Sequence, residues 1–103
     1  MDYQVIFKDT FVEDLERMLR SIAVDNPIAA SNLSQLIIQK AESLSFFPER
    51  HPRVRERQAI RRFIVKPHFK IFYRVCQEPR TVEILRCWDG RQKSDPSLLV
   101  EGR

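Results

Sequence analysis

Cationic side chains dominate the middle third of the sequence. Residues 50–74 contain nine Lys or Arg residues and one acid, Glu56, and so carry a net charge of +8 in a chain whose total is +4. Residues 1–49 contain four basic and eight acidic residues, and residues 75–103 contain five of each. Charge that is this segregated favours an anionic partner, such as a nucleic acid, the ribosome or an acidic peptide. The alternative is a solvated surface without a specific partner.

Other residue types that could do chemistry form no recognisable constellation. The only glycines are Gly90 and Gly102, which excludes a glycine-rich phosphate loop, and no metal-ligand spacing or carboxylate pair stands out. Cys76 and Cys87 fall on neighbouring predicted strands, several residues apart along the sheet. That separation is too large for a disulfide, so we expect two packed thiols. The sequence therefore predicts no metal and no cofactor.

Few side chains near the basic segment could transfer a proton. His51 and His68 fall in a predicted loop and a predicted turn, where we expect ordinary surface residues. Tyr3 and Tyr73 lie on predicted strands, and we expect both to pack in the core. The middle of the chain is thus rich in cations and poor in acid–base groups.

The length of 103 residues predicts a single domain, 1–103. Asp2, Lys8 and Asp9 interrupt the N-terminal apolar run, so we expect no signal peptide. No stretch approaches the roughly 18 apolar residues that a membrane span needs. The sequence therefore predicts a cytoplasmic protein with no membrane partner.

A strand and two helices are predicted to come first. Alternating apolar residues indicate a strand over 3–7, and Asp9 or Thr10 is expected to cap a helix over about 10–24. The apolar stripe of that helix consists of Phe11, Leu15, Met18, Leu19 and Ile22. Asn26 and Pro27 are typical of a restart, which predicts a second helix over about 27–46 in an antiparallel hairpin.

Three strands are predicted to follow a loop. Residues 48–59 lack a sustained apolar period and contain two prolines, so we expect an extended, arginine-rich loop. Strands are predicted at about 60–66, 69–76 and 81–88. The fold class is therefore α+β, with the order β-α-α-β-β-β and the helical hairpin packed on one face of a small antiparallel sheet. The tail, 94–103, is expected to be flexible. The sequence leaves open whether its apolar end docks on the domain or frays.

The last hairpin predicts which side chains share a face. With a loop at 77–80, Arg74 faces Glu83 and Lys70 faces Cys87. The face toward the helices then contains Phe69, Ile71, Tyr73, Val75, Val82, Ile84, Arg86 and Trp88. Arg86 is the exception on this apolar face, and we expect it to pair with an acid on the first helix unless it has a functional role. On the other face, Phe72 and Leu85 would be exposed and could promote self-association.

The order of these elements resembles the RelE/ParE toxin superfamily of type II toxin–antitoxin systems, the plasmid stabilisation type. The resemblance covers residues 3–93. Four phrases carry it: Pro27-Ile28-Ala29-Ala30, the run from Leu44 to Pro48, Phe69-Lys70-Ile71-Phe72-Tyr73-Arg74-Val75, and Val82 through Arg91. It implies a growth-inhibiting toxin neutralised by a cognate antitoxin.

The superfamily offers two activities. RelE-like members cleave mRNA in the ribosomal A site, whereas ParE-like members inhibit DNA gyrase and are not known as nucleases. By resemblance, a nuclease would use Lys70, Arg91 and Arg62 (or Arg61) to position phosphate and stabilise charge. The chain departs from the nuclease pattern because Asp89 stands where many relatives carry histidine, and no Tyr or His follows residue 73. The sequence therefore favours the ParE-like activity, with the ribosome-dependent endoribonuclease as the alternative.

A larger basic set is expected to bind the target, whether that is gyrase, the ribosome with its mRNA, or nucleic acid bound by a non-toxic module. Its members are Arg53, Arg55, Arg57, Arg61, Arg62, Lys66, Lys70, Arg74 and Arg86. We expect them to form one cationic surface on the strands. The antitoxin is expected to cover that surface or to wrap the helices with a segment that folds on binding.

Overall fold

The structure is a computed structural model that describes residues 2–91. Its elements in chain order are β1 (Gln4–Phe7), α1 (Asp9–Asp25), α2 (Pro27–Glu42), the 3₁₀ turns η1 (Ser43–Ser45) and η2 (Pro48–Arg50), β2 (Arg53–Val54), β3 (Arg57–Val65), β4 (Phe69–Gln77) and β5 (Arg80–Asp89). The predicted α+β class and the order of a strand, two helices and then strands are confirmed. The tail predicted to be flexible lies outside the described residues.

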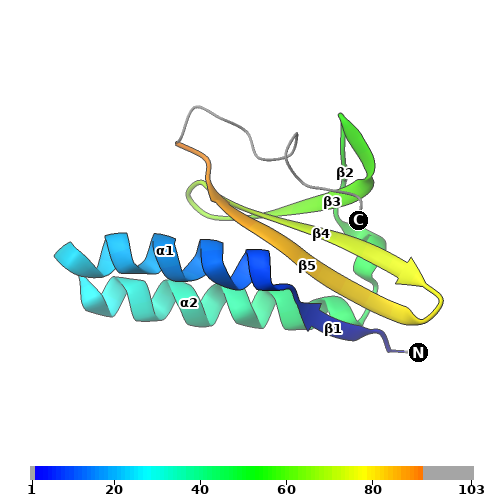
Figure 1. The fold of residues 1–103 in the computed structure, drawn as a ribbon, viewed down its shortest axis with the longest axis horizontal. Coiled ribbons are helices and arrows are strands. Elements are labelled where there is room, and N and C mark those ends of the chain that lie inside the picture. The colour runs from blue at the N-terminus through cyan, green and yellow to red at the C-terminus, as the bar shows by residue number, and fades with distance from the viewer. Residues whose placement is uncertain (1, 92–103) are drawn as a thin grey trace.

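The strands form one five-stranded mixed sheet in the order β1-β5-β4-β3-β2. The pairs from β2 to β5 are antiparallel, as predicted, but β1 pairs with β5 in parallel. The helical hairpin lies along one face of this sheet (Figure 1). We call the opposite side the open face. No helix in the described part of the chain is long and apolar enough to cross a membrane.

Of the two predicted helix caps, one is wrong and one is confirmed. Lys8 occupies the N-cap position of α1 without a side-chain cap, so the predicted cap by Asp9 or Thr10 is wrong. The Asn26 side chain accepts a hydrogen bond from Ala29 N at 3.0 Å, which confirms the predicted start of α2. That helix ends at Glu42, earlier than predicted, because the chain tightens there into a 3₁₀ turn.

The main core lies between the helices and the sheet. Its fully buried side chains include Phe11, Ile37, Leu44, Val65, Ile71, Tyr73, Val82 and Ile84. Tyr73 packs as predicted, and its hydroxyl donates to Pro48 O at 2.6 Å. Burial raises the pKa of this phenol to about 12, so Tyr73 stays protonated and holds η2 against the sheet.

A second, smaller apolar cluster lies on the open face. Phe72 and Leu85 pack there with Val54 and Ile60, and Trp88 packs against the cluster. Phe72 is 0% exposed and Leu85 is 5% exposed, so the prediction that they are exposed is wrong. The reason is that the predicted loop 48–59 is partly a strand pair: β3 begins at Arg57, and β2 pairs with it. This hairpin supplies the residues that cover the open face.

Candidate functional site

The predicted register of the last hairpin holds for half of its length. Arg74 pairs with Glu83, as predicted, but a β-bulge follows between Phe72 and Tyr73 of β4. Beyond it, Phe72 pairs with Arg86, and Lys70 pairs with Trp88 instead of the predicted Cys87. A shift of one residue exchanges the two faces of a strand. Arg86 and Trp88 therefore belong to the open face, and Cys87 belongs to the main core.

Arg86 forms the ion pair expected with an acid of the first helix. Its Nε and Nη2 donate to Asp14 Oδ2 and Oδ1 at 2.6 and 3.0 Å. Asp14 also accepts from the Cys87 backbone N–H at 3.1 Å and from Arg17 Nη1 at 3.4 Å. The hydrogen bond from Arg86 to Asp14 raises the pKa of the guanidinium. The carboxylate is buried and its hydrogen bonds are saturated, so Arg86 is engaged within the chain.

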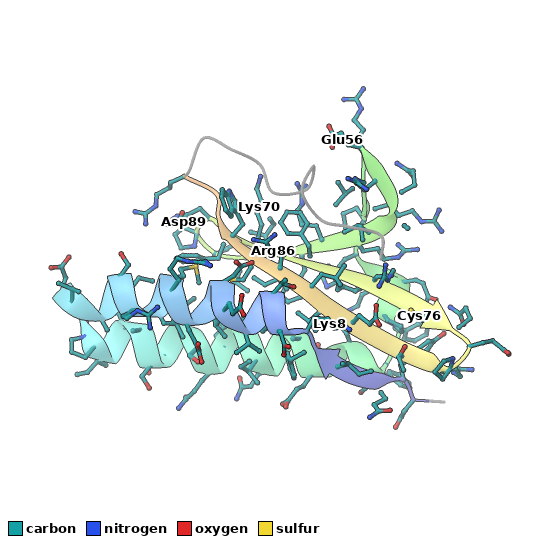
Figure 2. All side chains as sticks on the ribbon, in the orientation of Figure 1. Lys8, Glu56, Lys70, Cys76, Arg86 and Asp89 are labelled. Atoms are coloured by element: carbon teal, nitrogen blue, oxygen red, sulfur yellow. The ribbon has the colours of Figure 1, made fainter. Side chains whose placement is uncertain are left out.

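Four cations gather on the open face in the register of the strands. Arg62 pairs with Phe72, which pairs with Arg86, so these residues form one row across three strands. Lys70 and Trp88 form the next row, and Figure 2 shows Lys70 on the side of the sheet away from the helices. Arg74 lies in the row beyond Phe72, where its Nε donates to Glu83 Oε1 at 3.0 Å.

The rest of the predicted basic set is distributed more widely. Arg53 on β2, Arg55 in the following turn and Lys66 in the β3–β4 turn are exposed, and Arg57 begins β3. The turn that contains Glu56 projects on the open-face side (Figure 2). Arg61 is different, because its Nη1 donates to Glu49 O at 3.1 Å and to His51 O at 2.8 Å. It therefore holds the η2 segment and does not share a face with Arg62.

A small polar cluster closes this end of the sheet. Asp89 accepts from Arg91 Nη2 at 2.7 Å and from Arg91 N at 3.0 Å. His68 Nε2 is buried and lies 3.3 Å from Asp89 Oδ1, without the geometry of a hydrogen bond. Gly90 N donates to His68 O at 2.7 Å, which joins the β3–β4 turn to the end of β5. A Cβ on Gly90 would lie 3.5 Å from Lys70 Cε, so the lysine borders this cluster.

The electrostatics of this cluster favour a fixed charge over proton transfer. The side-chain hydrogen bond from Arg91 lowers the pKa of Asp89, and the same bond raises the pKa of Arg91. Asp89 is therefore a weak base whose charge is neutralised by the arginine. Sequence reasoning missed the approach of His68, because both residues lie just outside the predicted strands, His68 in a turn and Asp89 after the last strand.

Both histidines are partly buried, contrary to the expectation that they are ordinary surface residues. The ring of His51 lies 5.4 Å from the ring of Phe63 and 6.3 Å from that of Tyr73. Burial lowers the pKa of His51, with a further contribution from Arg50. A neutral, packed imidazole at this position supports the loop, away from the open face.

A cleft of about 500 Å³ lies between α1 and the end of β5. Arg17, Arg86 and Arg91 line it together with Asp14 and Asp89.

Cys76 and Cys87 are free thiols, and burial raises the pKa of Cys87 to about 12, so that thiol is unreactive. Within residues 2–91, no three His, Cys, Asp or Glu side chains lie close enough together to hold a metal ion.

Comparisons with known proteins place this geometry in a family. A family model described as the ParE toxin of the type II toxin–antitoxin system parDE matches residues 5–94. The chain therefore belongs to the ParE toxin family and is a ParE-family toxin of a type II system. No curated protein matches the sequence.

Two solved structures share the fold. One is described as the chromosomal ParDE TA system from P. aeruginosa, with a TM-score of 0.71, 19% identity, and coverage of 82% of this chain and 92% of that chain. The other is described as the toxin–antitoxin complex RelBE2 from Mycobacterium tuberculosis, with a TM-score of 0.60 and 26% identity. That match covers 84% of this chain and 96% of the other. The strand, helical hairpin and sheet are thus common to ParE-like and RelE-like proteins.

Proposed function

We propose that this toxin arrests growth in the cytoplasm by inhibiting DNA gyrase without cleaving nucleic acid. The observation that carries the proposal is the ion pair between Arg91 and Asp89. A phosphoryl-transfer site needs cations that are directed at the phosphate. Arg91 is directed instead at a carboxylate, and a negative charge at that position repels phosphate.

We also propose a cognate antitoxin as partner. The two similar solved structures named above are described as a toxin–antitoxin system and a toxin–antitoxin complex. The open face carries Arg62 and Lys70 beside Trp88, which suits a segment that contains acidic and apolar side chains. The other predicted contacts of the basic set, Arg53, Arg55, Arg57 and Lys66, remain a prediction for this interface or for the target.

The test is a supercoiling assay with purified gyrase and purified toxin. We expect the toxin to block supercoiling while mRNA on programmed ribosomes stays intact. An excess of the antitoxin should restore supercoiling. Cleaved mRNA together with unimpaired supercoiling would overturn the proposal.

The cluster of His68, Asp89 and Arg91 at the end of the sheet favours a second candidate, the ribosome-dependent endoribonuclease. His68 brings an imidazole to the end of the sheet that Lys70 borders, although no histidine follows residue 73 in the sequence. An imidazole next to a carboxylate can act as an acid or a base. If this candidate is correct, programmed ribosomes should yield cleaved mRNA, and Lys70→Ala combined with Arg91→Ala should abolish the cleavage.

A further inference from the structure

Two adjacent phenylalanines project from the loop that joins η1 to η2. Phe46 is 56% exposed and Phe47 is 72% exposed. Their rings meet edge to face, with centroids 5.3 Å apart. Neither ring belongs to the main core or to the open-face cluster. Packing among the described residues therefore does not explain why two large apolar side chains stand here.

The backbone at Phe47 adopts a conformation that is unfavourable for a bulky residue. Its φ and ψ angles are 51° and 55°, in the left-handed region. Among residues 2–91 it is the only non-glycine residue with a positive φ. Glycine, asparagine and aspartate account for most residues in this region, because a Cβ crowds the following carbonyl. Strain of this kind clusters at binding and catalytic sites.

Hydrogen bonds from two side chains, one local and one on the sheet, hold the loop in this conformation. Arg50 Nη1 donates to Phe46 O at 2.6 Å and to Phe47 O at 3.3 Å. From the sheet, the Tyr73 hydroxyl holds Pro48 O at 2.6 Å. The two rings are thus presented by a backbone that is fixed before any partner arrives, which lowers the entropy lost on binding.

A hollow beside the rings shows what kind of group they would receive. Its volume is about 280 Å³, and its lining consists of Tyr3, Phe46, Phe47, Pro48, Glu49 and Arg80. The Arg80 guanidinium lies 4.4 Å above the Tyr3 ring. The lining contains one acid and one base, so the hollow has no net charge, and its other four residues are three aromatic residues and a proline. Such a site suits an aliphatic or aromatic side chain of a protein and does not suit a phosphate.

We propose that Phe46 and Phe47 are the apolar anchor by which the toxin grips its protein target, and that a target side chain enters the hollow beside them. The inference rests on the proposed function in one respect, namely that the target is a protein. Two covered aromatic rings bury at most about 500 Å². A stable interface needs about 800 Å² from each partner, so the pair is too small to form an interface by itself and suits the centre of a larger one.

The test compares two double variants that remove exposed apolar side chains. Phe46→Ser with Phe47→Ser removes the anchor, whereas Val24→Ser with Ile28→Ser removes two residues that are 81% and 73% exposed at the far end of the helical hairpin. We expect the first variant to lose growth arrest and to need about 30-fold more toxin for half-inhibition of gyrase supercoiling. The second variant should behave like the wild type, and both should keep their affinity for the purified cognate antitoxin.

The outcomes separate this inference from the proposed function. Wild-type growth arrest by the Phe46/Phe47 variant would overturn the anchor, and so would an equal loss of antitoxin binding, because the antitoxin would then be the occupant. If the wild-type toxin leaves gyrase active, the proposed function fails. Comparing growth arrest by the wild type and the Phe46/Phe47 variant then still tests whether these residues are the anchor.

A single substitution distinguishes an anchor from a structural loop. Phe47→Gly relieves the left-handed conformation, so we expect the Tm to rise by about 2 °C or more while toxicity falls. A Tm that falls together with the toxicity would overturn the anchor and would assign Phe47 to the stability of the loop.

Discussion

The two halves of β5 are stabilised in different ways. From Thr81 to Ile84, the strand pairs with β1 on one side and, in the predicted register, with β4 on the other. After Ile84, β1 has ended and α1 takes its place beside the strand (Figure 1). The Thr10 hydroxyl then donates to Leu85 O at 2.7 Å, and Asp14 accepts from Cys87 N at 3.1 Å. Two side chains of α1, one helical turn apart, thus make the main-chain hydrogen bonds that a neighbouring strand would otherwise make.

The difference shows where the fold positions its candidate site. The regular half of β5, from Thr81 to Ile84, belongs to the core, and its cross-strand pair, Arg74 with Glu83, follows from the pairing of main chains. The bulged half of β5, from Leu85 to Asp89, carries Arg86, Trp88 and Asp89, and the bulge determines which of them reach the open face. A bulge re-aims side chains at the point where it interrupts the ladder. The end of the sheet that carries the candidate site therefore depends on a few contacts from α1.

The largest effect is expected from removing Asp14, the carboxylate that accepts hydrogen bonds from both Arg86 and Cys87 N in the bulged half. Asp14→Ala leaves Arg86 without its partner and Cys87 N–H without an acceptor, which should lower the free energy of unfolding by about 3 kcal/mol. Urea denaturation measures the loss. Glu13→Ala, on the exposed side of α1, is the matched control and should change stability by less than about 0.5 kcal/mol. Equal stability of the two variants would show that the helix does not support the strand.

The sequence predicts the regular half of β5 well, because alternation and the turn at 77–80 suffice when the main chain pairs without interruption. The pair Arg74 with Glu83 follows from that reasoning. The bulge could not be predicted in this way, since its acceptor and donor groups lie about 70 residues away on α1. One residue did give a signal: a charged Arg86 on a predicted apolar face pointed to an acid on the first helix.

The candidate site was predictable in residue type and less so in arrangement. Arg62 and Lys70 reach the open face as neighbours of Phe72 and Trp88. Arg61 could not be assigned from sequence, because its role depends on carbonyl groups of the η2 segment. The approach of His68 to Asp89 was not predicted either, because both residues lie just outside the predicted strands.

Gly90 offers a second way to disturb the bulged half, at its other end. A Cβ at this position would lie 2.6 Å from His68 O, a backbone atom that cannot swing away. Gly90→Ala should therefore separate the β3–β4 turn from β5 and cost about 2 kcal/mol in thermal or urea unfolding. Arg91→Ala, one residue further on, should leave the Tm close to the wild-type value. An unchanged Tm for Gly90→Ala would mean that the end of the sheet is looser than the contact to His68 indicates.

The same change from threonine to valine, made once for each half of β5, compares the two halves directly. Thr10→Val removes the hydroxyl that satisfies Leu85 O, and should cost about 1 kcal/mol, because the carbonyl loses its donor. Thr81→Val lies on the regular half, where the hydroxyl reaches Pro79 O only at 3.4 Å, so its loss should be smaller. Valine keeps the shape of threonine in both cases. If Thr81→Val were the more damaging change, the regular half would depend on side chains more than the bulged half does.

The smallest effect is expected from the charge of Asp89. Because Arg91 lowers the pKa of this carboxyl in the folded chain, the ionised form contributes stability that is fully present above the pKa of the unfolded chain. This contribution is lost as the pH falls through the folded-state pKa. Asp89→Asn should thus be slightly less stable than the wild type at pH 7, with a Tm difference that shrinks below about pH 4. Thermal melts of both proteins from pH 7 to pH 3 measure that difference. A constant gap across the whole range would assign the effect of Asp89 to packing, and would leave Arg91 free to turn toward a phosphate.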